Sequence, residues 1–115
     1  MQAVLVKPQI KIIQPKGYLN TSNTPEFKSK LTAAVLAPES GCLVVNLGQV
    51  EFLDSADLMA LISAFNLSKR LNRRFVLCSV SPPIRMIFEL TKLDRAFEFF
   101  ENRDSFESTT SEGTL

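Results

Sequence analysis

The spacing of apolar side chains changes several times along the chain, and each change predicts a new element. Two short apolar runs, Cys42–Leu47 and Phe75–Val80, are too short for helices and favour strands, the second buried on both faces. Between them the spacing becomes helical from about Ala56 to Leu71. The predicted core face of this helix, at i, i+3, i+4 and i+7, is Leu58, Leu61, Ile62 and Phe65.

The N-terminal part contains two strand candidates and a helix. The runs Val4–Lys7 and Gln9–Gln14 are separated by Pro8, which cannot donate a hydrogen bond within a sheet. We expect Asn23 or Thr24 to begin the helix, with Glu26 completing a capping box on Asn23. Its expected core residues are Phe27, Leu31, Ala34 and Val35.

The C-terminal part adds a third helix, opened by Pro82 and Pro83, and a last short strand at Phe97–Phe100. Asn102 or Asp104 is the expected cap of a closing helical turn. The chain of 115 residues is the length of one domain. Its alternating strands and helices predict an α/β fold with a largely parallel sheet.

The run Val50–Leu58, VEFLDSADL, ends the first buried strand region and opens the second helix. We expect Asp54 or Ser55 to cap this helix, which stabilises it by ~1 kcal/mol. Asp57 favours the positive end of the helix dipole. Ser55 is therefore a serine at the mouth of a helix, with an acidic residue on each side.

Charge and composition exclude several functions. A net charge of +1 provides no long-range field for nucleic acid or an anionic membrane. The basic run at 69–74 is expected to complement the C-terminal dipole of the second helix. No apolar segment approaches the ~18 residues of a membrane span, and the N-terminus does not resemble a signal peptide, so we expect a cytoplasmic protein. Cys42 and Cys78 are expected to be core thiols, with a disulfide the minor alternative.

The chain is poorly equipped for catalysis. It has no histidine, which excludes a Ser-His-Asp triad, and no glycine-rich phosphate loop. Asp54 and Asp57 are interpreted as capping residues, not as a catalytic or metal-binding pair. We therefore predict no enzyme activity and no cofactor. Ser55 makes more sense as the substrate of a kinase than as a nucleophile, although the pattern alone favours a purely capping role.

The second helix is apolar over more than half of its circumference. Beyond its core face it carries Met59, Ala60, Ala64 and Leu67. This leaves two interpretations: a helix that is well covered within the domain, or a partner-facing patch with Met59 as an adaptable contact.

The Val44–Leu58 region resembles the signature of STAS domains, the fold of bacterial anti-sigma factor antagonists. In that family an apolar strand is followed by Asp or Asn, an apolar link, and Asp-Ser-small-Gly-Leu. Residues 17–20 (GYLN) resemble the family's Gly-x-Leu-Asp turn, 24–28 (TPEFK) its first helix start, and 79–97 its last strand and helix. The resemblance covers residues 9 to 108. One departure is Asp57, which stands where the family usually has glycine.

The resemblance implies one STAS domain over residues 1–108, followed by a polar tail over 109–115. Its sheet would be open, mostly parallel and of 4–5 strands, with helices packed chiefly on one face. It further implies an anti-sigma factor antagonist that acts by partner switching. Ser55 would be the phosphoacceptor. The surrounding partner-binding residues would be Asn20, Asn46, Asp54, Ala56, Asp57, Leu58 and Met59.

The implied partners are an anti-sigma factor serine kinase, which supplies ATP and magnesium, and a metal-dependent serine phosphatase. No nucleic acid and no membrane insertion are expected. The alternative is a non-phosphorylated STAS subunit of a transporter or another complex, in which the domain only binds protein. STAS domains also resemble the small partners of ATP-binding transporter subunits.

Overall fold

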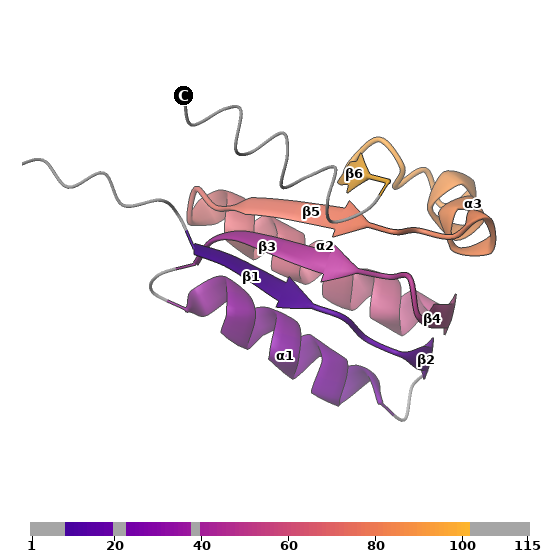
Figure 1. Ribbon diagram of the computed structural model, residues 1–115, viewed down its shortest axis with the longest axis horizontal. Coiled ribbons are helices and arrows are strands. Elements are labelled where there is room, and N and C mark those ends of the chain that lie inside the picture. Colours follow the sequence, from indigo (N-terminus) through magenta and orange to yellow (C-terminus); the bar gives the residue numbers. More distant parts are fainter. Residues whose placement is uncertain (1–8, 20–22, 38–39, 102–115) are drawn as a thin grey trace, which may run out of the picture.

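The computed structural model describes residues 9–19, 23–37 and 40–101 (Figure 1). Its main sheet has four strands in the order β1-β3-β5-β6, and all of its strand pairs are parallel. These strands are β1 (Gln9–Ile13), β3 (Ser40–Asn46), β5 (Arg74–Cys78) and β6 (Glu98–Phe100). The three helices are α1 (Thr24–Leu36), α2 (Ser55–Arg70) and α3 (Pro82–Leu90). The predicted α/β fold with a parallel open sheet is confirmed.

A second, two-stranded sheet lies beyond the ends of the main one. It pairs β2 (Gly17–Leu19) with β4 (Val50–Leu53), again in parallel. Gly17 begins β2 with φ +75°, a conformation that glycine adopts without strain, and its N–H donates to the carbonyl of Gln49 at 2.8 Å. The apolar pattern of the sequence did not distinguish β4 from the preceding strand. That β4 is a separate strand matters, because it ends at Leu53, directly before the start of α2.

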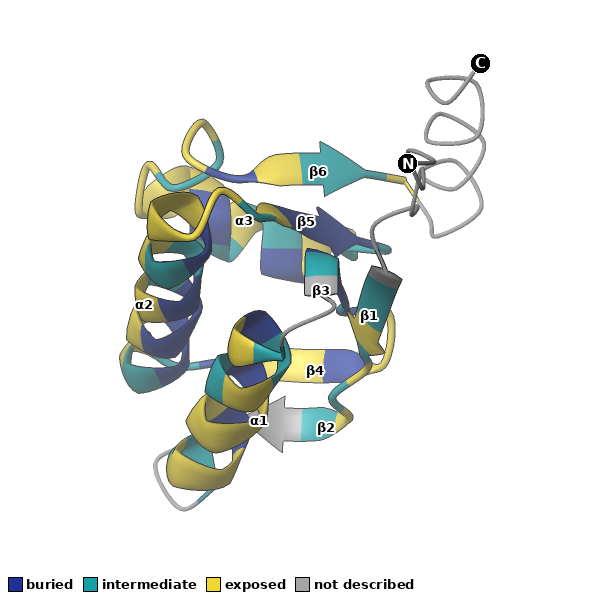
Figure 2. Ribbon diagram, turned by 90° about the vertical axis from the view of Figure 1, so that its left-hand side faces the viewer, coloured by how far each residue is buried: buried dark blue, intermediate teal, exposed yellow. Residues whose placement is uncertain are grey.

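α1 and α2 lie side by side against one face of the main sheet (Figure 2). Their apolar stripes face inwards: Phe27, Leu31 and Val35 of α1 are buried, as are Leu58 and Leu61 of α2. α3 contacts β4 and buries Ile84 and Phe88 in the same core. This core contains a group of phenylalanine rings with centroids 4.9–5.9 Å apart: Phe65, Phe75, Phe88, Phe97 and Phe99.

The other face of the sheet carries a second, smaller apolar cluster. Alternation along β3 and β5 places Cys42, Val44, Val76 and Cys78 in it. The predicted burial of β5 on both faces is confirmed. Cys42 pairs in register with Arg74, and Cys78 with Asn46. The two thiols are thus offset by about 13 Å along the strands, too far for a disulfide, and both are free.

The basic residues at the end of α2 and just after it contact different parts of the fold. Lys69 and Arg70 lie in the last turn of α2, as predicted from its dipole. Arg73 instead donates to the carbonyl of Val35 and, at 2.8 Å, to that of Ala37, at the C-terminal end of α1. Arg74 forms a bidentate pair with Glu98 of β6. For these two residues the prediction was wrong, because their partners are distant in sequence.

Two further expectations concern capping. Asn23 is the N-cap of α1, but its side chain makes no capping hydrogen bond, and Glu26 pairs with Lys30 at 3.3 Å. The predicted capping box on Asn23 is therefore wrong. The strand candidate Val4–Lys7, the cap at Asn102 or Asp104, and the tail 109–115 lie outside the described residues. Within the described part of the chain, no helix is both long enough and apolar enough to span a bilayer.

Candidate functional site

The candidate site is the first turn of α2, which the backbone reaches directly from β4. Leu53, the last residue of β4, is buried and anchors the chain in the core. Asp54 follows in an extended conformation as the N-cap, which confirms one of the two predicted capping residues. Ser55 is then the first helical residue, and it is exposed. An accessible hydroxyl therefore lies at the positive end of the helix dipole.

A reciprocal capping box closes this turn. The Asp57 N–H donates to Asp54 Oδ1 at 3.0 Å, and the Asp54 N–H donates to Asp57 Oδ2 at 3.2 Å. Two of the amides that a helix start leaves without partners are thereby satisfied. The first intrahelical bond runs from the Leu58 N–H to the carbonyl of Asp54 at 3.1 Å. Helix geometry leaves the amides of Ser55 and Ala56 without an intrahelical acceptor.

Asp57 points into the protein. Its residue is 0% exposed, and its Oδ1 accepts a hydrogen bond of 2.6 Å from Thr24 Oγ1, 33 positions earlier in the sequence. Burial raises the pKa of the Asp57 carboxyl, partly opposed by the hydrogen bond from Thr24. The glycine-to-aspartate departure therefore places a carboxylate between two helices. Asp57 offers no surface to a partner, which corrects its inclusion among the docking residues.

The other predicted docking residues fall into four groups. Met59, one turn after Ser55, is 59% exposed. Asp54, Ala56 and Asn46 are partly exposed. Leu58 is only 7% exposed and belongs to the core, so it too is unsuited to direct contact. Asn20 lies outside the described residues.

The exposures also separate the two interpretations of α2. Ala60 and Ala64 are buried, and Leu67 packs against the core. Most of the apolar circumference of α2 is therefore covered within the domain, as the first interpretation held. Of these apolar side chains, only Met59 fits the second interpretation, a patch on α2 that faces a partner.

Asn46 shapes the turn that precedes β4. Its Oδ1 accepts a hydrogen bond of 2.8 Å from the Gly48 N–H. A Cβ on Gly48 would lie 3.0 Å from that oxygen and 3.2 Å from Cβ of Ser79, so a larger residue would not fit without movement. Asn46 thus has a structural role in directing the chain from β3 towards β4.

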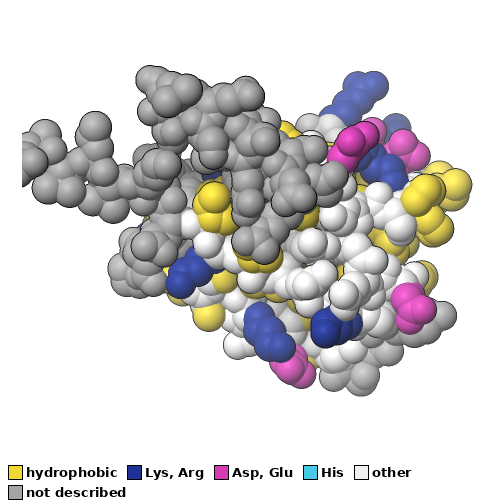
Figure 3. Space-filling view, viewed as in Figure 1, with side chains coloured by type: hydrophobic (Ala, Val, Ile, Leu, Met, Phe, Trp, Pro, Cys, Tyr) yellow, Lys and Arg dark blue, Asp and Glu magenta, His cyan; other side chains and the backbone are white. Residues whose placement is uncertain are grey.

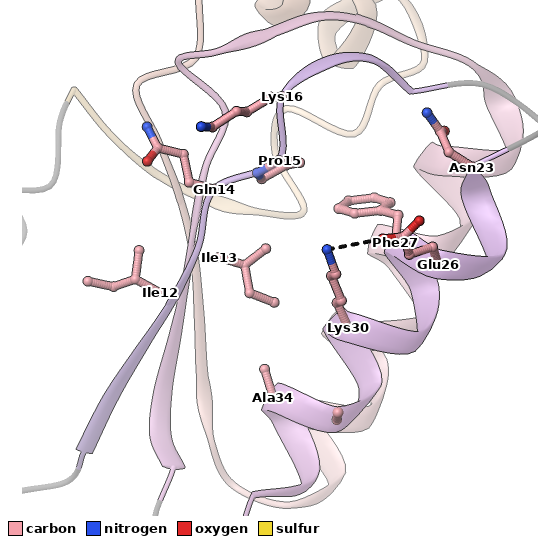
Figure 4. A pocket seen from close by; sticks show the side chains of 11 residues that line it. Ile12, Ile13, Gln14, Pro15, Lys16, Asn23, Glu26, Phe27, Lys30 and Ala34 are labelled. Carbon is pink, nitrogen blue, oxygen red and sulfur yellow. Dashed lines mark ion pairs between the residues drawn. The ribbon is translucent and has the colours of Figure 1, made fainter.

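Two surface features lie away from Ser55. A hollow of about 590 Å³ separates β1 from α1, where Ile13 and Phe27 point into the space and Lys30 pairs with Glu26 at its rim (Figure 4). Hydrophobic side chains also gather at the end of the molecule where α3 lies (Figure 3). Met86 and Leu90 of α3 are 56% and 77% exposed.

Among the described residues, no three His, Cys, Asp or Glu side chains are grouped as a metal site would require.

Thr24 is the site residue that sequence reasoning missed. We expected it only as a possible cap of α1, not as a donor to α2. The Asp-x-x-Asp spacing of Asp54 and Asp57 is that of a capping box and could have indicated the inward orientation of Asp57. No local pattern connects it to Thr24.

Two of the known proteins to which the chain is similar are named as anti-sigma factor antagonists. The candidate anti-sigma factor antagonist BtrV of Bordetella bronchiseptica is 24% identical over 90 residues, which cover 78% of this chain and 77% of BtrV. The anti-sigma F factor antagonist of Paenibacillus polymyxa is 19% identical over 91 residues, which cover 79% of this chain and 78% of that protein. The chain is thus similar, at low identity, to anti-sigma factor antagonists.

Solved structures agree on the fold. The anti-sigma factor antagonist SpoIIAA of Bacillus, in its unphosphorylated form, superposes with a TM-score of 0.71 at 16% identity, covering 97% of both chains. A sulfate transporter family protein from Wolinella succinogenes superposes with a TM-score of 0.73 at 13% identity, covering 90% of this chain and 88% of that one. The STAS domain family matches residues 2–106, and the chain therefore belongs to this family of non-enzymatic regulatory domains.

Proposed function

We propose that this chain is an anti-sigma factor antagonist that acts by partner switching, with Ser55 as the reversible phosphoacceptor. The observation that carries the proposal is the exposed Ser55 hydroxyl at the first position of α2. Unphosphorylated, the chain binds an anti-sigma factor that is also a serine kinase. Phosphorylation ends that complex, and a metal-dependent serine phosphatase restores the hydroxyl. The proposed kinase and phosphatase imply a cytoplasmic location for the chain.

The chemistry requires a hydroxyl from this chain and the remaining groups from the kinase. Ser55 Oγ attacks the γ-phosphorus of ATP held with magnesium by the partner. The new O–P bond forms as the bond from the γ-phosphorus to the bridging oxygen breaks, ADP leaves, and the serine proton passes to a base on the kinase. This chain contributes the nucleophilic oxygen and its placement, so no cofactor is needed on it.

The first turn of α2 explains why the modification would act as a switch. The product carries about −1.5 to −2 charges. The two amides not used by the capping box, those of Ser55 and Ala56, can donate to it in the free protein. Against a partner the same dianion must be desolvated beside the partly exposed Asp54. A penalty of ~3 kcal/mol weakens binding more than a hundredfold.

The comparisons support this reading. Two relatives carry names of anti-sigma factor antagonists. SpoIIAA has also been solved in a phosphorylated form, which superposes on this chain with a TM-score of 0.68 at 17% identity.

Calorimetry with the cognate kinase tests the switch. Ser55→Asp and Ser55→Glu should weaken binding far more than Ser55→Ala, because only the acidic variants imitate the charge of the phosphate. Ser63→Glu is the matched control, because Ser63 is exposed two turns further along the same helix. Equal affinities for Ser55→Ala and Ser55→Glu would reject the electrostatic switch.

The second candidate is a constitutive STAS subunit of a transporter or another complex, which binds protein without being phosphorylated. It is favoured by the likeness to the sulfate transporter family protein. Co-purification separates the two candidates. Recovery of a serine kinase or phosphatase supports the switch, whereas recovery of a transporter subunit supports the alternative.

A further inference from the structure

The first turns of α1 and α2 are joined by one buried carboxylate. Thr24 is the first residue of α1, and its hydroxyl donates to Asp57 Oδ1 at 2.6 Å. The other oxygen of the same carboxylate accepts from the Asp54 N–H at 3.2 Å. We propose that Thr24 and Asp57 form a clasp between the two helix starts, and that both are positioning residues for the Ser55 hydroxyl. The positioning role rests on the proposed function of Ser55.

The geometry of the clasp constrains Ser55 from both sides. Asp57 uses one carboxylate oxygen for each helix, so rotating its side chain breaks at least one of the two bonds. Its own N–H is held by Asp54 Oδ1 at 3.0 Å. Ser55 lies between Asp54 and Asp57 in the sequence, and these hydrogen bonds hold both aspartates in place. The backbone that carries the exposed hydroxyl is therefore tied, through Thr24, to α1.

Burial makes the Thr24 hydroxyl important to this arrangement. Asp57 is 0% exposed, so water does not replace a lost hydrogen bond at its Oδ1 without an opening of the turn. Removing the Thr24 donor leaves a buried carboxylate oxygen with one partner fewer. The first turn of α2 then opens to hydrate it, and the direction of Ser55 Oγ is no longer fixed.

Phosphoryl transfer is sensitive to such a loss, because the attacking oxygen must lie in line with the leaving group. A displacement of about 1 Å can lower a rate by roughly a hundredfold. Beyond the opened turn, the exposed surface near Ser55, including Met59 one turn further along α2, stays in place when Thr24 changes. Loss of the clasp should therefore lower kcat for phosphorylation and leave KM nearly unchanged.

The test compares Thr24→Val, which keeps the shape and removes the donor, with Thr24→Ser, which keeps the donor. Thr32→Val is the matched control, because the Thr32 hydroxyl donates only within α1, to the carbonyl of Lys28 at 2.9 Å. With the cognate kinase, Thr24→Val should lower kcat by about tenfold, with Thr24→Ser and Thr32→Val near the wild type. Urea titration establishes that every variant is folded under the assay conditions. A wild-type kcat for Thr24→Val, or an equal loss in Thr32→Val, would overturn the positioning role.

Amide hydrogen exchange tests the clasp without any partner. In Thr24→Val the amides of Asp54 and Asp57 should exchange about tenfold faster than in the wild type, with the C-terminal turns of both helices unchanged. Unchanged exchange at these two amides would overturn the clasp itself. If the wild-type chain is not phosphorylated at Ser55, the proposed function and the positioning role fail together. The exchange measurement still decides whether the clasp exists.

Discussion

Arg73 offers a direct test of how α1 is held in place at the end opposite the clasp. Its guanidinium follows α2 in the chain but donates to the carbonyls of Val35 and Ala37, which terminate α1. Replacement by methionine keeps the length of the aliphatic stem and removes both donors. A hydrogen bond from a charged donor contributes about 1.5–3 kcal/mol when well buried. Because Arg73 is only partly buried, we take ~1 kcal/mol for each bond.

Arg73→Met should therefore lower the free energy of unfolding by about 2 kcal/mol, and the melting temperature by about 8 °C at this chain length. Urea titration and thermal melts followed by far-UV circular dichroism measure both quantities. Arg70→Met is the matched control, because it removes one positive charge from the exposed last turn of α2. It should change the free energy of unfolding by less than about 0.5 kcal/mol. Arg73→Lys should restore part of the loss. Equal effects of Arg73→Met and Arg70→Met would show that the hydrogen bonds from Arg73 to the end of α1 do not stabilise the fold.

Three further predictions follow from single side chains. Cys42 and Cys78 are buried, and burial raises the pKa of the Cys42 thiol to about 11. Both thiols should react with a thiol reagent at pH 8 at least about a hundredfold faster in guanidinium than in the native protein. Equal reaction rates in the two conditions would contradict the burial of these thiols. The raised pKa of Asp57 contributes stability that is present below its ordinary value of 3.8 and is lost as pH rises through the folded-state pKa. In urea titrations the free energy of unfolding of the wild type should accordingly fall relative to that of Asp57→Asn as the pH is raised above 3.8. A relative rise would show that the sign is wrong. Lys92 follows α3 with φ +61°, so Lys92→Gly should raise the free energy of unfolding by about 0.5–1 kcal/mol, and a loss of stability in chemical denaturation would count against backbone strain there.

The regular elements could be predicted because their apolar periods are local. In the strand around Val44, alternate side chains point to opposite faces of the sheet, and both faces are apolar. In α2, the apolar side chains that face the core, such as Leu58 and Leu61, recur with helical spacing. The exposed serine at a helix start was also predictable, because Asp54 and Ser55 stand where the spacing changes from strand to helix. Each of these inferences uses neighbours within one or two turns.

The features that the sequence did not reveal depend on contacts between distant segments. The strands β2 and β4 are only three and four residues long, too short for a periodic pattern, and they form by pairing with one another. Asp57 looked like a surface carboxylate because its partner, Thr24, lies 33 positions earlier. Arg73 looked like a helix-dipole charge because the carbonyls that it contacts belong to α1. Tertiary packing decided these orientations.

In the proposed switch, the exposed Ser55 hydroxyl accepts a phosphoryl group. The most direct measurement incubates the full chain with its cognate kinase, ATP and magnesium, and maps the product by mass spectrometry. We expect one added phosphate on the peptide that contains Ser55, none on the same peptide of Ser55→Ala, and undiminished labelling of Ser63→Ala. An unmodified wild-type chain, or equal labelling of Ser55→Ala, would contradict this expectation.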